Sequence, residues 1–316
     1  MKIEIELAPQ HKSGLLLRNP VMLASGPSGY GVEYSKSAEI QRLGALVCAG
    51  VTLRPRAAQA QPLLLETSSG VLSAFDRPSP GVSKVLRHYA ATWATWQTPV
   101  IVNLAGTSLN DFADLAARLD GVPGVAALEL NLACPNLAAD GASFSSDPAL
   151  ITRLIATVRR QCTLPIIAKL APAGGDLRPA ALAAASAGVD ALALIHSLPG
   201  LSIDLTTRRP ALFGGLSGPA IKPLALRILY DVARELRLAY PNIPLIGVGG
   251  IANAQDALAF ILAGASAIQI GTLNLINPRA GIEILEGIEA FLRAEGIADI
   301  AEIIGAALDD TSASPD

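Results

Sequence analysis

The residues best suited to chemistry stand together at the end of one short apolar run. The stretch 127–136 reads ALELNLACPN, so Asn131, Cys134 and Asn136 lie close together and Pro135 forces the chain to turn beside them. Polar and reactive side chains just past the carboxyl end of a buried strand are found where a β/α barrel places its chemistry. An isolated cysteine is more often a buried structural residue, but the surrounding chain favours the chemical role.

An apolar run of this length without helical spacing predicts a strand buried on both faces. Eight such runs follow one another: Val21–Ser25, Ala45–Ala49, Val100–Leu104, Ala127–Leu132, Ile166–Leu170, Ala191–Ile195, Leu245–Val248 and Ala267–Ile270. Segments typical of helices follow most of them, for example Pro148–Arg160, Pro179–Ala187, Pro223–Ala239 and Ala254–Ala263. The alternation predicts an α/β fold, a single (β/α)8 TIM barrel, whose active site lies past the carboxyl ends of the strands.

The whole chain, 1–316, is predicted to be one barrel domain, because no linker-like change of composition divides it. Within residues 1–20, the segments Lys2–Leu7 and Gly14–Leu17 predict a short N-terminal β-hairpin at the bottom of the barrel. The small, polar residues 309–316 are expected to form a disordered tail.

Composition argues against several classes of function. A formal net charge of −3 provides no basic surface for nucleic acid and no polybasic patch for a membrane. The three cysteines, Cys48, Cys134 and Cys162, are too far apart for a disulfide framework or a metal site. The N-terminus is unlike a signal peptide, and the most apolar region, Ala180–Ile195, is interrupted by Gly188. We therefore expect a cytoplasmic protein with no metal, nucleic-acid or membrane partner.

Two connections are too long to be simple turns. Residues Arg54–Lys84 follow the second predicted strand, and Ser197–Gly218 follow the sixth. Since both leave the carboxyl ends of strands, both are expected to lie over the mouth of the barrel, where long loops build sites.

Glycine-rich turns after the later strands predict a phosphate site. The seventh strand ends in Gly247–Gly250 before a helix that starts near Asn253, the eighth ends in Gly271–Thr272, and a further turn, Gly214–Pro219, precedes another helix. Glycines let backbone N–H groups approach an anion, and helix starts add a favourable dipole. One such turn would mean little, but three at neighbouring barrel positions favour a phosphorylated ligand.

Several motifs together resemble a known family, the dihydroorotate dehydrogenases, and most closely the class 1B catalytic subunits. The similarity covers most of the chain and includes ASG (24–26), ETSSG (66–70), ELNLACPN (129–136), KLAP (169–172), GGLSGPAIKP (214–223), GVGGI (247–251) and GT (271–272). The GGLSGPAIKP and LNxxCPN patterns are specific, whereas the GG and GT patterns alone would be weak.

The resemblance implies FMN in the mouth of the barrel. Ten residues match the flavin-binding positions of the family: Ser25, Asn103, Asn131, Lys169, Ile195, Gly218, Gly249, Gly250, Gly271 and Thr272. Lys169 agrees with this, because a buried ammonium needs an anionic partner, which a reduced flavin provides. The alternative is a structural lysine paired with a core carboxylate, for which no acidic residue near a strand end is an obvious partner.

The resemblance also implies oxidation of dihydroorotate to orotate in pyrimidine biosynthesis by a flavin-dependent dehydrogenase acting on a CH–CH bond. Cys134 is then the general base, and a hydride passes from the neighbouring carbon to flavin N5. The chain has no cluster-type cysteine spacing and no second dinucleotide fingerprint, so electrons leave to a small oxidant or through a partner. The implied partner is an electron-transfer subunit with FAD and an iron–sulfur cluster, and two copies of this chain would pair.

Several substrate positions depart from the family. The differences are Ala49 for a lysine, Ser73 for an asparagine, Asp76 and Arg77 for small and apolar residues, and His196-Ser197 for an Asn-Thr pair. Loss of a cation facing a buried carboxylate costs about 2–5 kcal/mol, which Arg77 could offset if it folds inward. Arg77 could equally pair with Asp76 on a solvated loop, and His196 could be a ligand donor, a second acid/base or a satisfied polar residue.

We therefore predict substrate contacts for six residues: Ser73, Arg77, Asn131, Asn136, His196 and Ser197. A different dihydropyrimidine or a related planar molecule is the alternative substrate. The alternative of another class is a flavin-free barrel that binds a phosphorylated metabolite, because the glycine-rich turns would serve it equally well.

Overall fold

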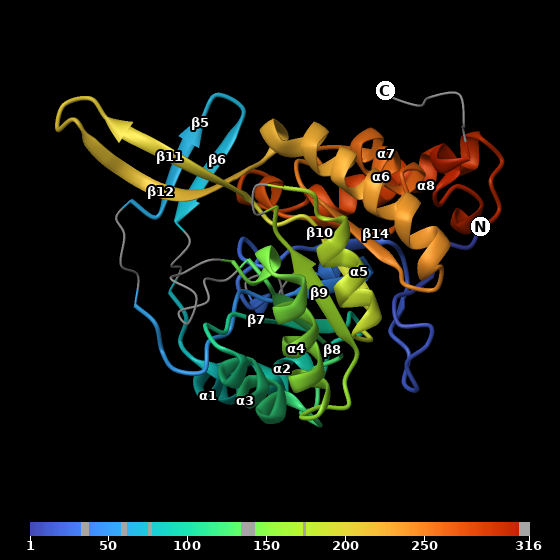
Figure 1. The fold of residues 1–316 in the computed structure, drawn as a ribbon. Helices are drawn as coiled ribbons and strands as arrows, with labels where there is room; N and C mark the ends of the chain where they lie inside the picture. Colours follow the sequence, from blue (N-terminus) through green and yellow to red (C-terminus); the bar gives the residue numbers. More distant parts are fainter. Residues whose placement is uncertain (33–37, 58–61, 75–77, 134–142, 173–174, 310–316) are drawn as a thin grey trace.

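The computed structural model describes residues 1–32, 38–57, 62–74, 78–133, 143–172 and 175–309. Eight parallel strands close into a barrel in the order β3, β4, β7, β8, β9, β10, β13 and β14, with β14 returning to pair with β3. The order around the ring follows the order along the chain, which confirms the predicted (β/α)8 barrel. Figure 1 shows the barrel from the side.

The eight barrel strands are those that the apolar runs predict. Their bounds are Val21–Leu23 (β3), Ala45–Val47 (β4), Val100–Leu104 (β7), Ala127–Asn131 (β8), Ile166–Leu170 (β9), Ala191–Leu194 (β10), Leu245–Val248 (β13) and Ala265–Ile270 (β14). Nearly every residue in them is buried, because outer side chains pack on helices and inner ones fill the barrel. The register sets Asn103 beside Glu129 and Asn131 beside Lys169, which brings polar residues of three neighbouring strands together.

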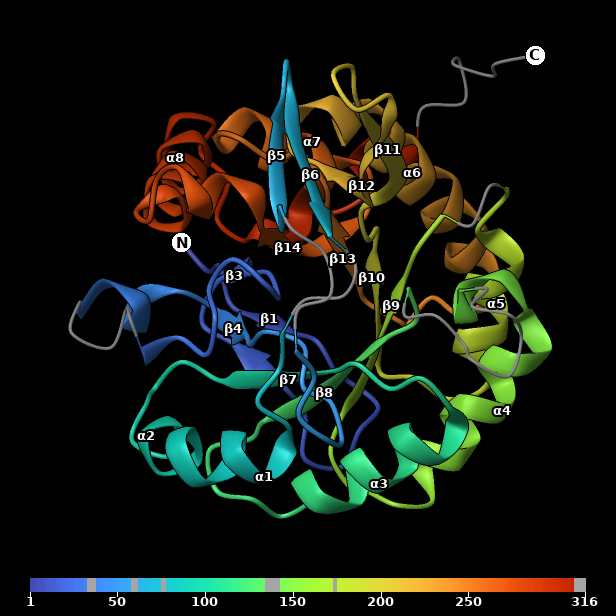
Figure 2. The same cartoon turned by 90° about the vertical axis from the view of Figure 1, so that its left-hand side faces the viewer.

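Amphipathic helices surround the strands (Figure 2). The principal ones are Leu109–Leu119 (α3), Pro148–Arg159 (α4), Arg178–Ser186 (α5), Lys222–Ala239 (α6), Ala254–Leu262 (α7) and Ala280–Ala294 (α8). The segment before β7 is helical over Val82–Val85 (α1), Leu86–Ala90 (a π turn) and Ala91–Trp93 (α2). Several begin at side chains that accept a backbone N–H, such as Ser108 and Asp147, as helix starts require.

The predicted N-terminal hairpin is present and short. Ile5–Glu6 (β1) pairs antiparallel with Leu16–Leu17 (β2). The Glu6 carboxylate accepts the backbone N–H groups of Ala8 and Leu15, which holds the connecting turn. Leu7 and Leu17 are fully buried and belong to the main core, so the hairpin packs on the barrel.

The two long connections contain a second sheet, where the sequence predicts only loops. Leu64–Thr67 (β5) and Gly70–Ala74 (β6) form one hairpin, Leu198–Asp204 (β11) and Arg209–Ser217 (β12) form another, and β12 pairs with β6 to join them. This antiparallel sheet stands beside the barrel in Figure 1. Its glycines, prolines and polar residues interrupt the apolar alternation that signals a strand, so pairing between distant segments determines it.

Among the described residues, no helix combines the length and the apolar character needed to cross a membrane.

Candidate active site

A cavity of about 420 Å³ opens at the carboxyl ends of the barrel strands, beneath the second sheet. All ten residues predicted to bind a flavin line it: Ser25, Asn103, Asn131, Lys169, Ile195, Gly218, Gly249, Gly250, Gly271 and Thr272. Ser73, His196 and Ser197, which the sequence predicts to contact substrate, line it as well. Residues from many separate segments thus meet in one cavity, as a barrel whose loops share one end requires.

Four buried polar side chains form a connected network inside the barrel. Glu129 accepts hydrogen bonds from Asn103 Nδ2 and Gln269 Nε2, each at 2.7 Å, through its two different carboxylate oxygens. The Lys169 ammonium donates to Gln269 Oε1 at 2.9 Å and lies 3.8 Å from the Glu129 carboxylate. Lys169 therefore has the core carboxylate partner that the alternative interpretation required, although no acidic residue near a strand end was an obvious candidate. Glu129 lies inside a strand, not at its end, and its side chain is fully buried.

The glycine turns form a cradle that larger residues would fill. Gly218, Gly249 and Gly250 have φ values of +88°, +131° and +72°, which favour glycine. A Cβ atom on Gly250 would lie 2.7 Å from the Cβ of Lys222 and 2.8 Å from the Gly218 carbonyl oxygen. One on Gly249 would lie 2.7 Å from the Cβ of Ala225. Backbone therefore lines this side of the cavity, as a phosphate site needs.

The starts of two helices are tied together beneath this cradle. The Asn253 side chain caps α7 by accepting the Asp256 N–H at 2.9 Å, as the sequence predicts. The buried Asp256 carboxylate accepts the Ala252 N–H at 3.0 Å and pairs with Lys222 at the start of α6. Two helix starts thus lie beside glycine turns on the cavity wall.

The second sheet closes one side of the cavity. Thr272, after β14, donates its hydroxyl to Ser217 Oγ at the end of β12 at 2.9 Å. Ser73 on β6 lies opposite Gly215 on β12. The hairpins therefore place Ser73 and Ser217 at the barrel mouth, where the long connections were expected to lie.

His196 lies in the cavity wall beside the buried network. Its Nδ1 is 2.9 Å from Ser197 Oγ, and its backbone N–H donates to the Leu170 carbonyl. Burial and, secondly, the nearby Lys169 charge lower the pKa of His196 to about 3. The imidazole is therefore neutral at neutral pH and can offer one donor and one acceptor.

The structure leaves part of the predicted substrate site open. Cys134, Asn136, Asp76 and Arg77 lie outside the described residues, so their predicted roles stay predictions. Ala133, which directly precedes Cys134, lines the cavity.

Some cavity residues were not predicted from the sequence. They are Arg56, Leu63, Ala105, Gln269, Leu273, Leu275 and Ile276, among others. The sequence could have indicated Gln269, because this polar residue stands on an apolar strand two residues before the predicted site residue Gly271. Nothing in the sequence indicated Arg56, since its position depends on an isolated backbone β-bridge to Ser79 within a long connection.

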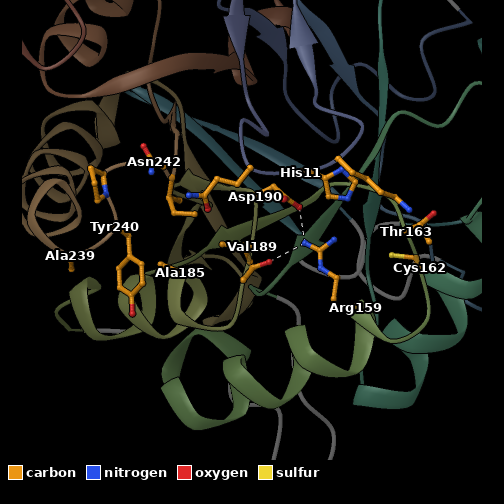
Figure 3. Close-up of a pocket in the computed structure, with 15 residues that line it drawn as sticks. His11, Arg159, Cys162, Thr163, Ala185, Val189, Asp190, Ala239, Tyr240 and Asn242 are labelled. Carbon is orange, nitrogen blue, oxygen red and sulfur yellow. Dashed lines mark hydrogen bonds and ion pairs between the residues drawn. The ribbon is translucent and has the colours of Figure 1, made fainter.

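A second cavity, of about 710 Å³, lies at the amino ends of the strands (Figure 3). Arg159 lines it, and its guanidinium donates to Asp190 at 2.7 Å, to the Gly188 carbonyl at 2.9 Å and to the Leu164 carbonyl at 3.0 Å. These bonds hold the chain before β9 and β10. None of the predicted catalytic or binding residues that the structure describes lines this cavity.

Comparisons with known proteins agree with the geometry. The family model described as dihydroorotate dehydrogenase matches residues 9–292. A protein of Desulforudis audaxviator named dihydroorotate dehydrogenase B (NAD(+)), catalytic subunit, is 48% identical, with 93% of this chain and 95% of the relative covered. Proteins of the same name from Trichlorobacter lovleyi (45%; 92% and 95% covered) and Pelobacter propionicus (44%; 93% and 96%) are similar too. The chain therefore belongs to the dihydroorotate dehydrogenase family, and its similar relatives are catalytic subunits of the B class.

Proposed function

We propose that this chain is a flavin-dependent dehydrogenase that binds FMN in the cavity at the carboxyl ends of its strands and oxidises dihydroorotate to orotate in pyrimidine biosynthesis. The observation that carries the proposal is that ten residues, matched to flavin positions by sequence alone, line one cavity in a member of this family. When bound, FMN supplies the acceptor for a hydride.

The residues present fit such a cofactor. Gly218, Gly249 and Gly250 form the backbone cradle for the phosphate. Asn103 Oδ1 is buried and has no hydrogen-bond partner among the described residues, so it needs a donor such as a ring N–H. Lys169 makes one described hydrogen bond, which leaves two of its three donors for a ring carbonyl or nitrogen.

The substrate is placed by the polar groups at the mouth. Cys134 takes a proton from one carbon of the dihydropyrimidine ring, while Asn131 and Asn136 hold the heterocycle through their amides. A hydrogen bond of Asn131 supports this arrangement. Its Oδ1 accepts the Ala133 N–H at 3.2 Å and so holds the backbone that directly precedes Cys134.

A different dihydropyrimidine, or a related planar molecule, is the second candidate substrate. The observation favouring it is that Ala49, Ser73 and His196 all line the cavity, so the departures from the family pattern lie where a substrate would be contacted. A neutral imidazole and a hydroxyl would then replace the amides of the family.

The relatives' names include the words catalytic subunit, which supports assembly with a partner. The proposed partner is an electron-transfer subunit that carries FAD and an iron–sulfur cluster, and the proposed core is a dimer of this chain. Co-purification of the two subunits, followed by measurement of the mass of the complex, tests both parts.

Flavin content and reduction test the main proposal. The purified protein is expected to be yellow and to release FMN on denaturation. Anaerobic addition of dihydroorotate should bleach the flavin absorbance. A colourless protein that takes up no FMN would refute the cofactor, whereas a yellow protein bleached only by another dihydropyrimidine would identify the second candidate substrate.

Cys134 is tested separately. The Cys134→Ala variant should keep FMN and lose most flavin reduction by substrate, about 10²–10⁴-fold for loss of a general base. The Cys134→Ser variant should keep a remnant that rises with pH, because a hydroxyl is a much weaker acid than a thiol. Unchanged reduction in Cys134→Ala would remove Cys134 from the mechanism.

A further inference from the structure

Three side chains, Asn103, Lys169 and Gln269, form what we call the cavity floor. All three contact one carboxylate, that of Glu129, which does not itself line the cavity. Glu129 is fully buried on β8 and is absent from the cavity wall, whereas its three network partners Asn103, Lys169 and Gln269 all line it. Whatever Glu129 does for a bound molecule, it does through these three side chains.

The carboxylate determines how the two amides are oriented. Since a carboxylate only accepts hydrogen bonds, each amide must turn its NH₂ group towards Glu129. Asn103 Nδ2 donates to one carboxylate oxygen and Gln269 Nε2 to the other, both at 2.7 Å. The carbonyl oxygens must then point away from Glu129.

This orientation has a different consequence for each amide. The Gln269 Oε1 atom faces the Lys169 ammonium and accepts from it at 2.9 Å, so the same orientation satisfies both neighbours of Gln269. The Asn103 Oδ1 atom is left buried without a partner among the described residues, in a side chain that lines the cavity. The cavity wall thus offers an acceptor from Asn103 and donors from Lys169, two side chains that lie at the same carboxylate oxygen of Glu129.

We propose that Glu129 is a positioning residue: through Asn103 and Gln269 it fixes which atoms of the cavity floor donate and which accept, and it supplies the charge that balances Lys169. This inference rests on the proposed function, because the molecule so recognised is the flavin ring. The ring edge that fits carries a carbonyl oxygen beside an N–H group, and the charge balance sets how readily the bound ring accepts electrons.

Charge balance is tested first without cofactor. Either single variant, Glu129→Gln or Lys169→Met, leaves one buried charge without its partner, whereas the double variant removes both. In a double-mutant cycle of urea unfolding on the apoprotein, the double variant should lose less stability than the sum of the two single losses. Additive losses would overturn the inference, and this readout stays valid even if the protein binds no flavin.

The cofactor-loaded protein provides the second readout. In Glu129→Gln the Lys169 charge is no longer balanced, so the midpoint potential of bound FMN should become more positive and sulfite should bind at least about tenfold more tightly. Glu289→Gln, the same change in a partly exposed pair on α8 with Arg293, is the matched control and should leave both values unchanged. An unaltered potential and sulfite affinity in Glu129→Gln would overturn the inference.

If Glu129→Gln does not retain FMN, Gln269→Leu replaces it. This variant keeps both charges but removes the amide between them, so the flavin absorbance spectrum should shift while the potential changes less than loss of a charge would require. An unaltered spectrum in this variant would also overturn the role given to the amides.

Discussion

At the scale of single residues, the site combines four buried polar side chains, Asn103, Glu129, Lys169 and Gln269, with the half-buried His196 beside them. His196 shows the energetic consequence. Its pKa is lowered to about 3 in the folded protein by burial and by Lys169, whereas a histidine in the unfolded chain titrates near 6.5. Between these values the unfolded chain binds a proton that the folded protein does not, so stability falls as the pH drops below about 6.5.

The His196→Asn variant should therefore lose part of the acid sensitivity of the fold. For one proton the difference amounts to about 1.4 kcal/mol per pH unit in the free energy of unfolding. Urea unfolding of the apoprotein at pH 7 and pH 4.5 measures it, with the exposed His88→Asn as control. Equal losses on acidification in wild type and His196→Asn would contradict the prediction.

The sequence predicts the lining residues better than their partners. Eight of the ten predicted flavin positions belong to the quoted motifs, and Asn103 and Ile195 stand at the ends of predicted strands. Glu129 carried a weaker signal: it stands two residues before Asn131 on a strand, so the two share a face of the sheet. The partner of Lys169 was missed because only residues at strand ends were considered, while the inside of a barrel also holds side chains from the middle of each strand.

At the scale of elements, the glycine turn after β13 fits its neighbours closely. Gly250 has a φ of +72° and its added Cβ would meet Lys222 and the Gly218 carbonyl, whereas Gly296 has a φ of +68° and nothing within 4 Å. The two glycines thus share the backbone strain of a substitution but differ in the space around it.

The Gly250→Ala variant should consequently lose more stability than the Gly296→Ala variant. Strain alone costs about 1–2 kcal/mol of unfolding free energy in Gly296→Ala, and overpacking adds about 1–3 kcal/mol in Gly250→Ala. Gly250→Ala should also weaken FMN binding by moving the cradle, while Gly296→Ala should not. Urea unfolding and fluorescence titration with FMN measure both effects; equal behaviour of the two variants would argue against a cradle at Gly250.

The amino ends of two strands depend on one carboxylate (Figure 3). Asp190 Oδ2 accepts from Arg159 and from the Ile166 N–H, each at 2.7 Å. Asp190→Ala leaves both donors without this partner and should cost about 1–3 kcal/mol without changing the flavin spectrum, because the site lies at the other end of the strands. The exposed pair of Arg227 and Asp231 supplies the control Asp231→Ala, expected to cost less than about 1 kcal/mol in urea unfolding. A spectral change in Asp190→Ala would show that the two ends are coupled.

The sequence predicted correctly those strands that are continuous apolar runs, because such runs are buried wherever they lie in a fold. The eight barrel strands are short apolar runs, and all eight are present. The sheet of β5, β6, β11 and β12 was missed because Gly200, Gly214 and Gly215 lie inside its strands. An added Cβ on Gly214 would lie 2.3 Å from the Ser73 carbonyl oxygen, so close strand approach requires the very residue type that predicts a loop.

At the scale of the whole molecule, the barrel holds its proposed cofactor at one end of the strands. The described cavity there is lined by site residues from β3 through to the segment after β14. Relatives 44–48% identical are named dihydroorotate dehydrogenase B (NAD(+)), catalytic subunit, yet this chain has no second dinucleotide fingerprint. We therefore expect electrons that reach the proposed FMN to leave through another molecule.

The purified chain, with dihydroorotate as donor, should therefore reduce a small dye such as dichlorophenolindophenol but not NAD⁺. Adding the electron-transfer partner should restore NAD⁺ reduction, because the nicotinamide then reacts at a second flavin and not in the barrel. Absorbance at 340 nm for NADH and bleaching of the dye measure the two reactions in the same preparation. If the chain alone reduced NAD⁺ as fast as the dye, the barrel cavity would have to admit the nicotinamide itself, and the division of labour between two subunits would be wrong for this protein.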